Sequence, residues 1–199
     1  MVSVLIDYRV KSRHKTTPYE SVKDAKSAMR FLRSHANEYG IKSEEMVASG
    51  GSAGGHLAAA VSMLSGVNED TDNLSVSSKA IAKILYNAFI DNGPMGFEHK
   101  RMGERYLEIS LMHNITKGTP PTIFFLGDKD KLIPVATAYE FKEKMEAVGS
   151  RCDAFIYKDQ EHGFFNKERQ ENDRCKLEST RETDVFLQFI DILKGKTTI

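Results

Sequence analysis

The sequence contains few cysteines, no surplus of charge of either sign and no long apolar run. Its two cysteines, Cys152 and Cys175, form neither a disulfide framework nor a clustered Cys/His metal set. Lys plus Arg and Asp plus Glu number 28 each, so no basic surplus favours nucleic acid or an anionic membrane surface as a partner. No apolar stretch approaches the roughly 18 residues of a membrane span, and no signal peptide is visible.

What is present is the alternation of an α/β protein. Of the 199 residues, 40% are hydrophobic, enough for one domain with a core, which we expect to span residues 1–199. Short apolar runs alternate with helical patterns, which predicts a mostly parallel sheet of about five strands flanked by helices. The strands are expected at 2–9, 46–51, 81–90, 122–127 and 152–158, with helices between them and after the last one.

This pattern includes two predicted capping boxes and one long connection. Thr17 with Glu20 predicts a helix start, and Pro18 suits its first position. Ser179 with Glu182 predicts the start of the last helix. Residues 91–120 hold Gly, Pro and mixed charge with room for one short helix, so we expect a lid-like connection there.

The stretch "MVASGGSAGGHLAAA" at 46–60 leaves a predicted strand and enters a helix. Gly50, Ser52 and Gly54 meet the pattern G-x-S-x-G, in which a serine occupies a sharp strained turn and neighbouring side chains would collide. Gly51 belongs to the same turn. The stretch does not match the dinucleotide-binding pattern G-x-G-x-x-G, because Ser52 stands where the second glycine would be. It does not match a phosphate-binding loop either, because no G-K-[ST] follows. The alternative is a glycine-rich turn with a passive serine.

A nucleophilic serine needs a base and an orienting acid, here in the chain order Ser, Asp or Glu, His. "FFLGDKDKLIP" offers Asp130 after the strand at 122–127, with Asp128 as the competing carboxylate that suits the turn itself. "DQEHGFF" offers His162 in the loop after the strand at 152–158.

The other histidines fit the pattern less well. His56 follows the turn and is expected to cover the helix after it, or to support the site indirectly. His35 lies on a predicted helix, and His14, His99 and His113 are expected to be solvated.

The motifs "DYR", "GGSAGGHLAA", "GDKDKLIP" and "EHGFF", in this order, resemble the α/β-hydrolase superfamily from residue 1 to about 194. The likeness is to carboxylesterases and acetyl esterases related to hormone-sensitive lipase and to bacterial acetylxylan esterases. The resemblance implies Ser52 as nucleophile, His162 as base and Asp130 as acid. The backbone N–H of Ala53 would be one oxyanion donor.

The chain departs from that family at its start. Members carry further strands and an H-G-G-G-like loop that supplies oxyanion donors, whereas this sequence opens directly on the "DYR" strand. Met1 is expected to be an internal methionine of a longer sequence or the start of a shortened protein, so localisation stays open. The strands at 2–9 and 46–51 would then pair directly or leave an open edge.

The resemblance implies a serine hydrolase that cleaves short-chain, acetyl-type carboxylic esters through an acyl-enzyme, without a metal or cofactor. Two alternatives stay open. The protein is a catalytically weak or inactive truncated hydrolase, because losing one oxyanion donor costs about 10²–10³ in rate, or it is a peptidase of the same fold.

Two further expectations concern surfaces. Met95, Phe97, Met102 and Tyr106 either line a substrate pocket or seal the core beneath a long loop. The apolar run at 2–9 lacks the lysines that blunt a strand edge, so we expect a homo-oligomer, most simply a two-fold dimer.

Overall fold

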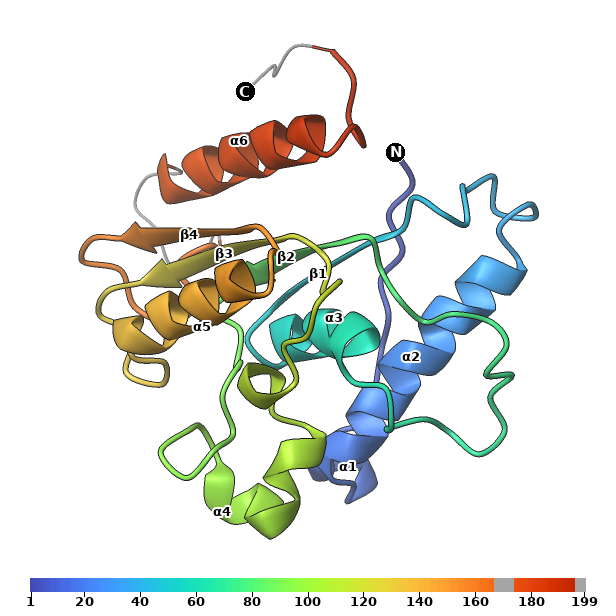
Figure 1. The fold of residues 1–199 in the computed structure, drawn as a ribbon, viewed down its shortest axis with the longest axis horizontal. Coiled ribbons are helices and arrows are strands. Elements are labelled where there is room, and N and C mark those ends of the chain that lie inside the picture. The colour runs from blue at the N-terminus through green and yellow to red at the C-terminus, as the bar shows by residue number, and fades with distance from the viewer. Residues whose placement is uncertain (167–173, 196–199) are drawn as a thin grey trace.

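The structure is a computed structural model that describes residues 1–166 and 174–195. Four parallel strands form one sheet in the order β1-β2-β3-β4 (Figure 1). They are β1 (Val47–Gly51), β2 (Ala82–Tyr86), β3 (Thr122–Gly127) and β4 (Cys152–Tyr157). The predicted parallel α/β class is confirmed, with four strands in the described residues where about five were expected.

Helices cover both faces of this sheet. One face carries α2 (Pro18–Ser34), α3 (Ala53–Met63) and α5 (Val135–Ala147), and the other carries α6 (Arg174–Phe189) (Figure 1). Side chains of β3 alternate between the two layers: Phe124 belongs to the core on the α3 and α5 side, whereas Ile123 and Phe125 join Phe186 of α6. All six residues of β3 are buried, as a central parallel strand requires.

The expected strand at 2–9 is wrong. Residues 1–10 have no secondary structure, and residues 1–7 are exposed. Arg9 instead ties this segment to α2, because its N–H and Nε donate to Asp24 at 2.7 and 2.9 Å and its guanidinium also pairs with Glu69. An apolar run becomes a strand only where a neighbouring backbone pairs with it. Among the described residues β1 pairs with β2 alone, so the open-edge alternative holds.

The two predicted capping boxes had different outcomes. The first is confirmed: Glu20 Oε2 accepts the backbone N–H of Thr17 at 2.8 Å where α2 begins. The second is wrong, because α6 already includes Arg174 and Ser179 lies inside it, donating to the carbonyl of Lys176 at 3.1 Å.

The long connection at 91–120 contains only short helical pieces. These are α4 (His99–Met102), η1 (Gly103–Glu108) and η2 (Leu111–His113). A further short helix, α1 (Lys11–His14), precedes α2. Tyr19 of α2 donates to the carbonyl of Arg105 at 2.9 Å, which joins the connection to the body of the fold.

Candidate active site

The parallel register brings the carboxyl ends of all four strands to one edge of the sheet. Gly51 is paired with Tyr86, Tyr86 with Phe125, and Phe125 with Phe155. Ser52 follows β1, Asp130 follows β3 and His162 follows β4. Ligand sites in open α/β sheets form at this edge.

Ser52 occupies a strained turn between β1 and α3. Its backbone has φ 55° and ψ −122°, a conformation that costs about 1–3 kcal/mol and persists only where its surroundings enforce it. The N–H of Ser52 donates to the carbonyl of Tyr86 at 2.8 Å, and its own carbonyl accepts the N–H of His56 at 3.1 Å. The turn is therefore fixed from both β2 and α3.

Close packing explains two glycines of this turn. A Cβ on Gly50 would lie 2.3 Å from the carbonyl oxygen of Gly54, and one on Gly55 would lie 2.7 Å from Cβ of Ala88. A Cβ on Gly51 would lie 2.4 Å from Cζ of the Phe165 ring, but a Cβ on Gly54 would meet nothing within 4 Å. The motif predicts that a side chain at Gly54 would collide with its neighbours. In the structure this holds for Gly55 instead, a residue outside the G-x-S-x-G pattern.

A continuous hydrogen-bond path joins Ser52, His162 and Asp130. Ser52 Oγ lies 2.9 Å from Nε2 of His162, and Nδ1 of His162 lies 2.7 Å from Oδ2 of Asp130. An ionised carboxylate only accepts hydrogen bonds, so Nδ1 carries the proton and Nε2 is the acceptor for the serine hydroxyl. The Asp130 side chain is 0% exposed and that of His162 is 22% exposed. The structure thus brings together the three side chains that the sequence proposed.

Asp130 accepts three more hydrogen bonds besides that of His162. The backbone N–H groups of Leu132 and Ile133 donate to Oδ1 at 2.8 and 3.1 Å. Nδ2 of Asn87 donates to Oδ2 at 2.9 Å. Sequence reasoning missed Asn87 because the strand was expected to run through it, over 81–90, whereas β2 ends at Tyr86. The one signal present was a polar residue within that apolar run.

His56 lies beneath this site rather than in it. It is buried, and its Nδ1 lies 2.7 Å from the carbonyl oxygen of Phe89. Burial lowers the pKa of His56 from its ordinary 6.5, so the ring is neutral near pH 7. The side chain supports the segment after β2.

The N-terminus of α3 lies directly after the serine. Ala53 is its first residue, so its backbone N–H has no acceptor within the helix. Such N–H groups, together with the helix dipole, favour negative charge at this end. The arrangement suits an oxyanion beside Ser52.

Aromatic rings extend from His162 toward the connection at 91–120. The ring of Phe89 stacks on His162 at 5.7 Å between centroids, and Phe97 stacks on Phe89 at 3.7 Å. Of the four pocket candidates, Phe97 therefore comes near the triad.

The other three candidates lie elsewhere. Met95 is 97% exposed, and Met102 is a buried member of the core. Tyr106 packs edge-on between His99 and His113, at 5.1 and 5.2 Å. Met102 therefore seals the core, as the second alternative expected. Met95 extends into solvent and does not line the site.

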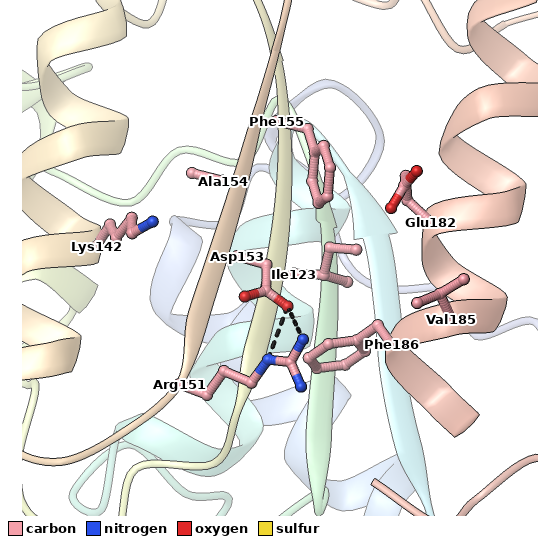
Figure 2. A pocket seen from close by; sticks show the side chains of 9 residues that line it. All are labelled: Ile123, Lys142, Arg151, Asp153, Ala154, Phe155, Glu182, Val185 and Phe186. Carbon is pink, nitrogen blue, oxygen red and sulfur yellow. Dashed lines mark hydrogen bonds and ion pairs between the residues drawn. The ribbon is translucent and has the colours of Figure 1, made fainter. Parts of the chain in front are cut away.

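A hollow of about 280 Å³ lies elsewhere on the molecule, between the start of β4 and α6 (Figure 2). Arg151 bridges it by binding Asp153 Oδ2 through Nε at 2.8 Å and through Nη2 at 2.6 Å, and its guanidinium lies 3.8 Å from the ring centre of Phe189. Arg151 precedes β4 and Asp153 lies near its start, at the sheet edge opposite Ser52. The hollow is separate from the candidate active site.

Two structural features are absent from residues 1–166 and 174–195. No group of three or more His, Cys, Asp or Glu side chains is placed to hold a metal ion. No helix in that part of the chain has the length and apolar character needed to cross a bilayer.

The fold is that of the α/β-hydrolase superfamily, and comparison with known proteins agrees. The chain belongs to the BD-FAE family, whose model matches residues 1–106, just over half of it. The dienelactone hydrolase family matches residues 107–195. The resemblance inferred from the sequence motifs is confirmed.

Two relatives, one of them solved in two forms, illustrate the likeness. Esterase 2 of Thermogutta terrifontis phosphorylated by paraoxon is 38% identical, with a TM-score of 0.88 over 96% of this chain and 71% of that one. The propionate-bound form is 37% identical, with a TM-score of 0.87 over 96% and 72%. Acetylxylan esterase of Xylanibacter ruminicola is 25% identical over 167 residues, 80% of this chain and 34% of that protein. The chain thus spans about a third of that curated relative.

Proposed function

We propose that the protein is a serine carboxylesterase that hydrolyses short-chain, acetyl-type esters through an acyl-enzyme on Ser52. The observation that carries the proposal is the path from Ser52 Oγ through His162 to Asp130, with distances of 2.9 and 2.7 Å. Two related structures support it, because Thermogutta terrifontis esterase 2 was solved phosphorylated by paraoxon and with propionate bound. A phosphorylated form and a propionate-bound form are what we expect of a serine esterase that acts on short acyl esters.

Acylation uses the geometry directly. Ser52 Oγ attacks the ester carbonyl carbon while His162 Nε2 takes the hydroxyl proton. Asp130 keeps the ring in the tautomer that accepts this proton and stabilises the imidazolium that forms. The carbonyl oxygen becomes an oxyanion and accepts the N–H of Ala53. As the tetrahedral intermediate collapses, the imidazolium returns the proton to the departing alcohol oxygen.

Deacylation repeats these steps with water. His162 Nε2 takes a proton from water as its oxygen attacks the acyl carbon, and the proton then passes to Ser52 Oγ as the acid leaves. Nothing in this cycle consumes a cofactor. The stacked rings of Phe89 and Phe97 would contact the substrate beside His162.

A short activated ester and a covalent probe test the proposal. We expect the wild type to hydrolyse p-nitrophenyl acetate and butyrate and a fluorophosphonate to modify Ser52. Ser52→Ala should abolish both with an unchanged melting temperature. Failure of the wild type to react with ester and probe alike would refute the proposal.

Two alternatives are decided by the same assay. Ala53 N–H is the one oxyanion donor assigned within the chain, and a missing donor costs about 10²–10³ in rate. A kcat/KM lower than that of Thermogutta terrifontis esterase 2 by this factor would favour the weak hydrolase. Hydrolysis of a p-nitroanilide with the acyl group of the best ester substrate tests the peptidase alternative. Faster cleavage of the anilide than of the ester would favour a peptidase.

We also propose that the chain self-associates through its N-terminal segment. Met1 and Leu5 are 96% and 98% exposed, beside a sheet whose strand β1 pairs on one side among the described residues. Exposed apolar surface of this kind favours association. Sedimentation at micromolar concentration should show a dimer, and a 22.4 kDa monomer would contradict it.

A further inference from the structure

We infer that Asn87 is a positioning residue of this site, holding the carboxylate of Asp130 in the plane that His162 requires and limiting the charge that Asp130 presents to it. The inference rests on the proposed function, because it gives Asn87 a part in the same reaction. Asn87 is 0% exposed, so it acts through Asp130 and does not touch substrate.

The Asp130 carboxylate is held by four N–H groups in a site closed to solvent. Two backbone N–H groups, from Leu132 and Ile133, fix Oδ1. Oδ2 is shared between His162 Nδ1 at 2.7 Å and Asn87 Nδ2 at 2.9 Å. A carboxylate has about four lone-pair sites, so this set is complete. Asn87 is the one side chain besides His162 that binds Oδ2 in the described part of the chain.

The orientation of the Asn87 amide follows from its neighbour. An ionised carboxylate accepts only, so the atom that faces Oδ2 is the NH₂ group, and the amide oxygen points away. That oxygen is buried and has no hydrogen-bond donor among the described residues. A buried amide that leaves its acceptor unpaired while its donor binds Asp130 is placed for that one contact.

The backbone of Asn87 is also fixed by its conformation and by hydrogen bonds to neighbouring strands. Its φ is +44°, a left-handed conformation that asparagine tolerates better than most residues. Its N–H donates to the carbonyl of Phe125 at 2.9 Å, which extends the ladder between β2 and β3. The preceding carbonyl, that of Tyr86, accepts the N–H of Ser52. Two consecutive residues at the end of β2 thus bind the nucleophile's backbone and the acid's side chain.

The shared oxygen gives Asn87 an electrostatic effect on His162. A neutral donor on Oδ2 draws negative charge away from His162 and so moderates the stabilisation of the imidazolium. Without that donor, Oδ2 would stabilise the imidazolium more strongly. A negative charge in place of the donor would strengthen the effect.

The other charged groups near the ring that belong to the described residues are placed to change little. Lys129 pairs with Asp159 and Lys131 with Glu161, all four of them mostly exposed and screened by solvent. Asp128 is exposed and accepts the N–H of Asp159. The neutral His56 is bound to the Phe89 carbonyl. Substitutions at Asn87 therefore change the environment of His162 through Asp130.

Two variants isolate the side chain from the backbone. Asn87→Gly keeps the positive φ without strain and removes the donor. Asn87→Asp keeps the shape and exchanges the donor for a carboxylate. We expect kcat on p-nitrophenyl acetate to fall about 10- to 100-fold in Asn87→Gly, the range for a charge-assisted hydrogen bond, with KM unchanged.

The acid limb of the kcat/KM profile is the discriminating readout. Its midpoint should move to higher pH by about half a unit in Asn87→Gly and by about one unit or more in Asn87→Asp. Asn92→Ala is the matched control, since Asn92 is also buried with an unpaired amide oxygen but donates to the Phe97 carbonyl. It should leave the midpoint in place.

A substrate-free measurement separates this inference from the proposed function. The downfield proton resonance of His162 Nδ1–H reports the bond to Asp130, and its change with pH should shift in the same order in the two variants. Midpoints equal to the wild type in both folded variants would overturn the role of Asn87. A wild type that turns over no ester, with the resonance shifting as expected, would overturn the proposed function alone.

Discussion

Asp128 and Asp130 lie two residues apart after β3, yet their carboxylates belong to different hydrogen-bond networks. Asp130 is buried and faces His162 Nδ1 at 2.7 Å, whereas Asp128 is exposed and accepts the backbone N–H of Asp159 at 2.7 Å. One carboxylate orients the ring, and the other joins the two loops that carry Asp130 and His162. The competition between them that the sequence left open is thus a division of tasks.

Asp130→Asn should lower kcat by about 10⁴ with little change in folding. The amide would present an N–H to Nδ1 or accept only weakly from it, so His162 would lose the tautomer that accepts the serine proton. Asp128→Asn is the control, because it keeps the oxygen that accepts from Asp159, and its kcat should stay within a few-fold of the wild type. Equal losses in the two variants would contradict this assignment.

Gly50→Ala should lower the free energy of unfolding by about 3 kcal/mol and abolish labelling of Ser52. Its Cβ would lie 2.3 Å from the backbone oxygen of Gly54, which cannot move without opening the turn. Gly54→Ala is the matched substitution, since its Cβ meets nothing within 4 Å and alanine suits a helix better by up to about 1 kcal/mol. Urea unfolding and probe labelling measure both effects. A Gly54→Ala variant as unstable as Gly50→Ala would be the contrary result.

Phe97→Ala should raise KM for aryl esters several-fold and leave kcat largely unchanged. Phe97 stacks on Phe89 at 3.7 Å, and Phe89 stacks on His162, so its ring lies where the ester would bind. Met95→Ala is the control, because Met95 is 97% exposed. Steady-state kinetics with p-nitrophenyl esters gives both parameters. Unchanged KM in Phe97→Ala would remove Phe97 from the substrate site.

Lys83→Met should raise the free energy of unfolding by about 2 kcal/mol at pH 6. Lys83 lies on β2 with 0% exposure, and its ammonium has no hydrogen-bond partner in the described residues. Burial lowers the pKa of Lys83 from 10.5 to about 7. Replacing this group with an apolar side chain of similar length removes the cost of burying it.

The pH dependence has a definite sign. Between pH 7 and 10.5 the unfolded chain binds the Lys83 proton and the folded chain does not, so the wild type gains stability as pH rises. The advantage of Lys83→Met is therefore full below pH 7 and shrinks toward pH 10.5. Urea unfolding at pH 6, 8 and 10 measures it, with the exposed Lys79→Met as control. An advantage independent of pH would contradict the buried-charge explanation.

The sequence by itself determined the elements whose signals are local. The apolar runs that became β2 and β3 needed only hydrophobic continuity between turn residues, and Thr17 with Glu20 needed only helix-capping chemistry. Ser52, Asp130 and His162 followed from motif order and the family resemblance, because each lies in the turn or loop after a strand of a parallel sheet. Parallel strands place such residues at one edge whatever the details of packing.

The tertiary structure alone decided what depends on contacts between distant residues. Residues 2–9 have the composition of a strand, but no described backbone pairs with them, and Arg9 binds Asp24 and Glu69 instead. Gly55 was needed because a Cβ at this position would lie 2.7 Å from Cβ of Ala88, in the segment after β2. Asn87 entered the site because its amide meets a carboxylate 43 residues away. Local patterns carry no information on such distances, since packing between elements sets them.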